Sequence, residues 1–203
     1  MRTENQKLKT ESYKLGVFGG AFNPPHVGHL IVAESAREKL QLDKIIFVPT
    51  GNPPHKSNTE LLNGKLRLQM VELAIAGNKF FDVSEVEFLR NDFSYTIDTL
   101  KIFQQMFPDA ELHLLIGADN FLELNTWKSI KEIISLAKVI VMNRGGIELK
   151  TNEYSSIVKF VNVPNIEISS SDIRKKIQLG KSIRYLVPKK VEEFIVKNKL
   201  YQK

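Results

Sequence analysis

Two histidines three residues apart follow a glycine pair in the segment Gly16-Val-Phe-Gly-Gly-Ala-Phe-Asn-Pro-Pro-His-Val-Gly-His29. Residues at positions i and i+3 of a helix share one face, so His26 and His29 would lie side by side in its first turn. The free N–H groups and the positive dipole end of such a helix would face the glycine turn and attract an anion. The segment therefore predicts binding of a phosphate chain such as that of a nucleoside triphosphate.

The neighbouring residues indicate how the two histidines are positioned. Residues 14–18 predict a buried strand, and Gly19-Gly20 allows a tight turn with close approach of a ligand. Asn23-Pro24 or Pro24-Pro25 is expected to supply the helix cap and the first helical residue. A glycine turn before a helix is also common in α/β proteins for packing alone, and neither GxGxxG nor GxxxxGK[ST] occurs here. The expected core stripe of the helix is Leu30, Ile31, Ala33 and Leu40.

Composition indicates one globular domain of ordinary character. Of 203 residues, 42% are hydrophobic and 26% are charged, so we expect a single domain over residues 14–203 after a disordered polar extension at 1–13. The chain has no cysteine and no apolar run of about 18 residues, which favours a cytoplasmic protein without membrane contact. The net charge of +6 suits anionic ligands. Nucleic-acid binding is not expected, because the lysines are spread along the chain.

Apolar runs alternate with helical patterns along the chain. This order predicts an α/β, doubly wound, mostly parallel sheet of about five strands with helices on both faces. Ligands of such sheets bind at the carboxyl ends of the strands. After the first strand, the predicted strands are residues 44–48, 80–86, 112–116 and 139–142.

The pattern Gly19-Gly20-x-Phe22-x-Pro24-x-His26-x-Gly28-His29 resembles the signature of the HxGH nucleotidyltransferases. This resemblance implies a Rossmann-like fold and transfer of a nucleotidyl group from a nucleoside triphosphate. Later motifs narrow it to the bacterial nicotinate-nucleotide adenylyltransferases, over nearly the whole chain from Leu15 onward. The substrates implied are ATP and nicotinate mononucleotide, the products are nicotinate adenine dinucleotide and pyrophosphate, and Mg²⁺ would be bound with the ATP phosphates.

The resemblance assigns catalytic roles to His26, His29 and Arg174. Arg174 lies in a segment similar to the ISSTxIR motif, with Ser171 in place of threonine. Serines at a helix start are usually caps, and a His-Lys pair in a loop is usually a solvated surface pair, so each assignment also has a structural explanation. The ATP-binding residues that the resemblance implies are Gly19, Gly20, Phe22, Gly28, His55, Lys56, Gly117, Asp119, Arg144, Ser169, Ser170 and Ser171.

A second set of residues is expected to hold the mononucleotide. The string Ser-Tyr-Thr-Ile-Asp-Thr-Leu at 94–100 resembles the segment that lines the pyridine-nucleotide pocket, although Ser94 or Thr96 would also be read as a helix cap. Trp127 is expected at another helix start, where its ring would suit a flat pyridine. The set is Ser94, Tyr95, Thr96, Trp127 and Lys128, with no protein metal ligand assigned. The closing segment from Tyr185 to Tyr201 is interpreted as structural.

Two other functions stay open at this point. A sister enzyme, such as a pantetheine-phosphate adenylyltransferase or a cytidylyltransferase, would share the HxGH motif and the late arginine. A nucleotide- or RNA-binding module could keep the fold without turnover. Assembly as a homo-oligomer is also left open, and residues 147–158 suggest no chemistry.

Overall fold

The computed structural model of the chain describes residues 12–52, 61–90, 93–144 and 151–202, apart from the side chain of Arg144. Most of the predicted extension, residues 1–11, lies outside these ranges. So do His55 and Lys56 of the predicted ATP-binding set. Among the described helices, none combines the length and the apolar character needed to cross a membrane.

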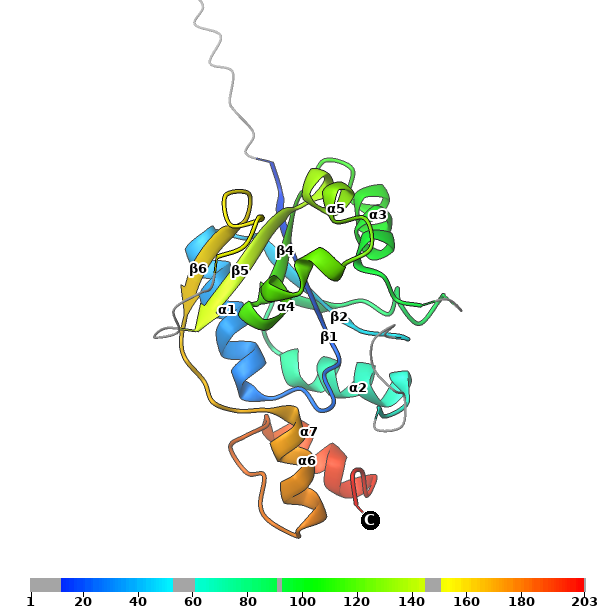
Figure 1. Cartoon of the computed structure of the whole chain (residues 1–203). Coiled ribbons are helices and arrows are strands. Elements are labelled where there is room, and N and C mark those ends of the chain that lie inside the picture. Colours follow the sequence, from blue (N-terminus) through cyan, green and yellow to red (C-terminus); the bar gives the residue numbers. More distant parts are fainter. Residues whose placement is uncertain (1–11, 53–60, 91–92, 145–150, 203) are drawn as a thin grey trace, which may run out of the picture.

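A six-stranded sheet in the order β3-β2-β1-β4-β5-β6 forms the centre of the molecule (Figure 1). Every neighbouring pair of strands is parallel. The predicted doubly wound α/β sheet is confirmed, with six strands instead of about five. The chain starts in the middle, builds β2 and β3 on one side of β1, and then crosses to build β4 to β6 on the other. The strands are β1 Lys14–Gly20, β2 Lys44–Pro49, β3 Phe81–Val83, β4 Glu111–Gly117, β5 Lys138–Arg144 and β6 Lys159–Val163.

Helices cover both faces of this sheet. The helices α1 (Val27–Leu40) and α2 (Gly64–Ile75) share one apolar cluster with Phe18 of β1, whereas α3 (Thr96–Met106) and α5 (Ile130–Leu136) share another with Val17. Burial on both faces explains why the central strands are almost continuously apolar. A short helix α4 (Ala118–Leu122) and a 3₁₀ turn η2 (Leu124–Thr126) follow β4.

The C-terminal helices form a separate layer below the sheet (Figure 1). In this layer α6 (Ser170–Gln178) and α7 (Lys189–Lys197) pack on α2 through a third apolar cluster that contains Met70, Ile173 and Val191. The backbone N–H of Val27 donates to the carbonyl of Leu186 at 3.0 Å. The last part of the chain therefore reaches the start of α1.

Several expected boundaries were wrong. His26 caps α1 instead of Asn23 or Pro24, so the turn after β1 is longer than the prolines suggested. Ile31 is 39% exposed and lies outside the core, whereas Ala36, which the expected core stripe did not include, is fully buried. The strand expected over 80–86 is only β3, and the chain then leaves the sheet toward Glu87.

Candidate functional site

A cavity of about 1000 Å³ lies at the carboxyl ends of β1, β2, β4 and β5. It straddles β1 and β4, where the strand order reverses, which is the usual ligand position in a doubly wound sheet. Its volume is at the upper end of the range for small-molecule sites. Every predicted site residue whose side chain the structure describes lines it: Gly19, Gly20, Phe22, His26, Gly28, His29, Ser94, Tyr95, Thr96, Gly117, Asp119, Trp127, Lys128, Ser169, Ser170, Ser171 and Arg174.

This common location does not test the individual roles, which stay predictions. Three members of the predicted set cannot be placed at the cavity. His55 and Lys56 lie outside the described residues. The backbone of Arg144 ends β5, and its side chain is likewise not described.

The turn between β1 and α1 fixes the two histidines relative to each other. The backbone N–H of His26 donates to Nδ1 of His29 at 3.1 Å, and the two rings stack with centroids 3.6 Å apart. Because Nδ1 of His29 accepts this bond, a neutral His29 carries its proton on Nε2. A Cβ on Gly28 would lie 3.0 Å from Nδ1 of His26, so the glycine gives the His26 ring room to pack on the helix start.

Phe22 and the pair Gly19-Gly20 determine the packing of the turn between β1 and α1. Phe22 adopts a left-handed backbone with φ 45°, is 2% exposed and places its ring 5.0 Å from that of His29. A Cβ on Gly20 would lie 3.1 Å from the Phe22 ring, whereas a Cβ on Gly19 would meet no atom within 4 Å. The absence of a side chain at Gly20 therefore makes room for the Phe22 ring, and its absence at Gly19 leaves space in the cavity.

Helix α6 is fastened to the same turn by side chains. Ser169 caps the helix by accepting from the N–H of Asp172 at 3.1 Å. Ser170 Oγ donates to the carbonyl of Pro24 at 2.8 Å, and Arg174 Nη1 donates to the carbonyl of Asn23 at 3.0 Å. The hydroxyls of Ser169 and Ser170 thus hold protein groups, and Ser171 Oγ accepts from Nη2 of Arg174 at 3.4 Å. The phosphate-binding roles of the three serines stay predictions.

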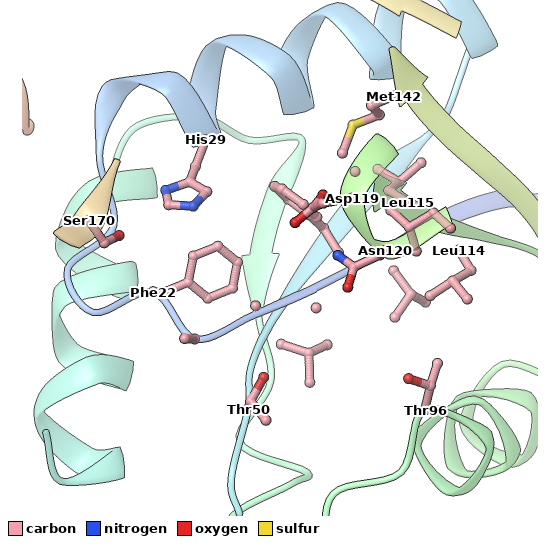
Figure 2. A pocket seen from close by; sticks show the side chains of 18 of the residues that line it. Phe22, His29, Thr50, Thr96, Leu114, Leu115, Asp119, Asn120, Met142 and Ser170 are labelled. Carbon is pink, nitrogen blue, oxygen red and sulfur yellow. The ribbon is translucent and has the colours of Figure 1, made fainter. Parts of the chain in front are cut away.

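The predicted mononucleotide residues gather on the other side of the cavity. Figure 2 shows Thr96 there, opposite His29 and Ser170. Lys128 Nζ lies 4.2 Å from the centre of the Tyr95 ring and 3.7 Å from Oδ2 of Asp98. The segments that carry Thr96 and Trp127, far apart in sequence, are therefore brought together.

Two local expectations on this side were wrong. Tyr95, and neither Ser94 nor Thr96, is the N-cap of α3. The Ser94 hydroxyl instead accepts from the N–H of Asn52 at 3.0 Å. Trp127 does not start a helix, because it ends the 3₁₀ turn η2 and its N–H donates to the carbonyl of Leu124 at 3.1 Å. The helix begins only after Ser129, whose φ of 56° separates the two elements.

Sequence reasoning missed a buried carboxylate in the cavity wall. Glu87 is 8% exposed, accepts from the N–H of Gly51 at 3.1 Å and accepts from Oγ1 of Thr99 at 2.8 Å. It ties the loop after β2 to α3. Its place a few residues after β3 is a signal that could have found it, because functional side chains gather at strand carboxyl ends. The other missed polar lining residues include Asn23, Thr50, Asn120 and Glu123.

A buried arginine supports the turn from beneath. Arg67 on α2 is 1% exposed, and its Nη1 donates to the carbonyl of Ala21 at 2.9 Å. Burial lowers the pKa of Arg67 to about 10, which still leaves the guanidinium protonated at neutral pH. Sequence reasoning missed Arg67 because it lies among apolar residues of a helix core.

Comparison with known sequences finds a family model and relatives that match most of the chain. A family model described as cytidylyltransferase-like matches residues 17–176. A probable nicotinate-nucleotide adenylyltransferase of Desulfitobacterium hafniense (strain Y51) is 41% identical over 198 residues, which is 93% of this chain and 96% of that protein. A protein of the same description from Thermoanaerobacter sp. (strain X514) is 40% identical over 200 residues, covering 94% of this chain and 95% of the relative.

Solved structures give the same picture of the fold. A putative nicotinate-nucleotide adenylyltransferase from Vibrio parahaemolyticus matches with a TM-score of 0.69 at 25% identity, covering 93% of this chain and 94% of that one. The Plasmodium falciparum nicotinic acid mononucleotide adenylyltransferase complexed with NaAD matches with a TM-score of 0.75 at 21% identity, over 93% of this chain and 97% of that one.

Proposed function

Because the chain belongs to the nicotinate-nucleotide adenylyltransferases of the cytidylyltransferase-like family, we propose that it transfers the adenylyl group of ATP to nicotinate mononucleotide. The products are nicotinate adenine dinucleotide and pyrophosphate, as in one step of NAD biosynthesis. The reaction needs two nucleotides side by side, with the reacting phosphates between them.

The observation that carries this proposal is the two-sided cavity. One side consists of the His26 and His29 turn together with Arg174, and the other carries Thr96 and Trp127. A volume of about 1000 Å³ gives room for a dinucleotide product. We assign the triphosphate to the first side and the pyridine nucleotide to the second.

The chemistry we propose is one in-line displacement at the α-phosphorus of ATP. A 5′-phosphate oxygen of the mononucleotide forms the new bond to this phosphorus, and the bond to the bridging oxygen breaks. Pyrophosphate leaves with that electron pair. The attacking phosphate is already ionised, so no general base is required, and catalysis comes from positioning and from stabilising charge.

The residues on the triphosphate side suit that task. Nε2–H of His29 is the imidazole donor that we direct at a phosphate oxygen, with His26 stacked behind it. Arg174 lies one turn into α6 and supplies a guanidinium, which pairs well with phosphate oxygens. We assign these three residues to charge stabilisation in the transition state.

Magnesium fits this site as an ion that arrives with ATP. Within the described ranges, no three His, Cys, Asp or Glu side chains gather to hold a metal. Mg²⁺ is commonly bound through substrate phosphates with one or two carboxylates, and the Asp119 carboxylate lines the cavity. When bound, the ion neutralises charge on the leaving pyrophosphate.

The test is a substrate panel read by pyrophosphate release. Purified protein is mixed with ATP or CTP and, in turn, with nicotinate mononucleotide or phosphopantetheine. We expect release only with ATP and nicotinate mononucleotide. Release with phosphopantetheine or CTP would indicate a sister enzyme, and no release with any pair would favour a binding module.

A further inference from the structure

The turn between β1 and α1 is held by three side chains from two helices, α2 and α6. The carbonyls of Ala21, Asn23 and Pro24 accept hydrogen bonds from Arg67, Arg174 and Ser170 respectively. Carbonyl oxygens carry partial negative charge and repel phosphate. Because these three carbonyls are hydrogen-bonded to protein donors, the cavity side of the turn is left to groups that attract anions.

A fourth contact reaches this turn from the end of the chain. Tyr201, just after α7, donates its hydroxyl to Oδ1 of Asn23 at 2.8 Å, across 178 positions of sequence. Asn23 is 3% exposed and lines the cavity. The Tyr201 ring packs on the C-terminal apolar cluster, so only its hydroxyl reaches toward the nucleotide site.

The chemistry of Tyr201 suits a permanent donor. Burial raises the pKa of its hydroxyl well above the usual value, and this effect outweighs the nearby charges of Arg174 and Arg67. The phenol therefore keeps its proton over the whole pH range in which the protein is handled. For packing alone a phenylalanine would serve as well.

We propose that Tyr201 is a positioning residue for the triphosphate, acting through Asn23. The hydroxyl holds the Asn23 side chain while Arg174 holds the Asn23 backbone, which sets the turn that leads into His26 and His29. The C-terminal segment thus takes part in shaping the nucleotide site. This inference rests on the proposed adenylyl transfer.

The experiment compares the parent protein with Tyr201→Phe, which removes one oxygen and keeps the ring. The matched control is Tyr185→Phe in the same C-terminal segment, since Tyr185 is 80% exposed. For each protein, kcat, both KM values, ATP affinity by titration and the thermal midpoint are measured. We expect Tyr201→Phe to lower kcat/KM for ATP by about tenfold, the order of effect that follows from removing one buried hydrogen bond. The KM for nicotinate mononucleotide should stay within about twofold, because its predicted site lies on the other side of the cavity, and the control should match the parent.

A double-variant cycle tests whether Tyr201 acts through Asn23. Asn23→Ala and Tyr201→Phe together should lose no more ATP affinity than Asn23→Ala alone, because coupled residues give non-additive losses. Multiplied losses would overturn the proposal, as would a lower thermal midpoint with unchanged ATP parameters. If the parent is active and Tyr201→Phe is equally active, only this inference is overturned. A parent that binds ATP without pyrophosphate release overturns the proposed function, and the ATP titrations then still decide the role of Tyr201.

Discussion

His29 is held so that one ring nitrogen faces protein. Its Nδ1 accepts the N–H of His26, so a neutral ring carries its proton on Nε2, the nitrogen that we propose donates to a phosphate oxygen. We expect His29→Ala to lower kcat by about 10²- to 10³-fold, because one preorganised donor to the transition state is lost. Steady-state kinetics with ATP and nicotinate mononucleotide measure the effect.

Ile31→Ala is the control for His29→Ala. Ile31 lies on the same helix, is 39% exposed and does not line the cavity. The kcat of Ile31→Ala should equal that of the parent. A His29→Ala protein that stays folded and turns over within a few-fold of the parent would remove His29 from the catalytic set.

Arg174 and Lys175 are neighbouring cations with different surroundings. Arg174 lines the cavity and bonds to the Asn23 carbonyl, whereas the Lys175 side chain is 73% exposed. We expect Arg174→Ala to lower kcat/KM for ATP by about tenfold or more, since hydrogen bonds to charged groups contribute about 1.5–3 kcal/mol. The KM for the mononucleotide should change little, and Lys175→Ala should change neither constant. The opposite pattern would place the triphosphate elsewhere.

Within the strand β1, two glycines differ in what surrounds them. A Cβ on Gly16 would lie 2.9 Å from Ile45 Cγ1, whereas a Cβ on Gly19 would meet nothing within 4 Å and would enter the cavity. We expect Gly16→Ala to reduce the free energy of unfolding by about 1–3 kcal/mol through overpacking. Gly19→Ala should keep the parent stability and lower kcat/KM for ATP on the order of tenfold to a hundredfold, because the methyl group displaces substrate.

Urea unfolding and kinetics on both glycine variants separate these effects. A destabilised Gly19→Ala protein would show that the glycine serves the fold. A stable and fully active one would show that the substrate does not approach this turn.

The same elements show what the sequence could predict. The strands β1, β2, β4 and β5 were found because both their faces are buried and their apolar runs are unbroken. The edge strand β6 was missed, since it buries only Val161 and Val163 of its five residues. The five-residue α4 and the 3₁₀ turn before Trp127 are too short for helical periodicity, so the chain path after β4 could not be read.

The candidate site shows the same limit. The glycine pair, the HxGH residues and the serine-capped α6 stand out because residue types at fixed spacing carry local chemistry. Contacts over long sequence separation leave no such trace. The bonds of Tyr201 to Asn23 and of Arg67 to Ala21 depend on how whole layers pack, and neither residue type is unusual where it stands.

At the scale of the whole molecule, the cavity lies where the two halves of the sheet meet, between β1 and β4. The side that we assign to the pyridine nucleotide combines the start of α3 at Thr96 with the Lys128 ammonium, which lies over Tyr95. The first N–H groups of a helix have no partner within it, and its positive dipole end favours an anion. Trp127 adds an aromatic face but no second helix start.

This arrangement predicts a preference for nicotinate over nicotinamide mononucleotide. The carboxylate of nicotinate accepts charge-assisted hydrogen bonds from the start of α3, each contributing about 1.5–3 kcal/mol, whereas the NH₂ group of the amide would face donors. We expect kcat/KM to favour nicotinate mononucleotide by about 10²-fold or more, since a site rejects a ligand that leaves its polar groups unpaired. Parallel assays of both mononucleotides with saturating ATP measure the ratio, and Lys128→Ala should reduce it while Lys175→Ala should not. Equal efficiencies would reassign the chain to dual specificity and would leave the proposed roles of His26 and His29 untouched, because those residues are assigned to the ATP side of the cavity.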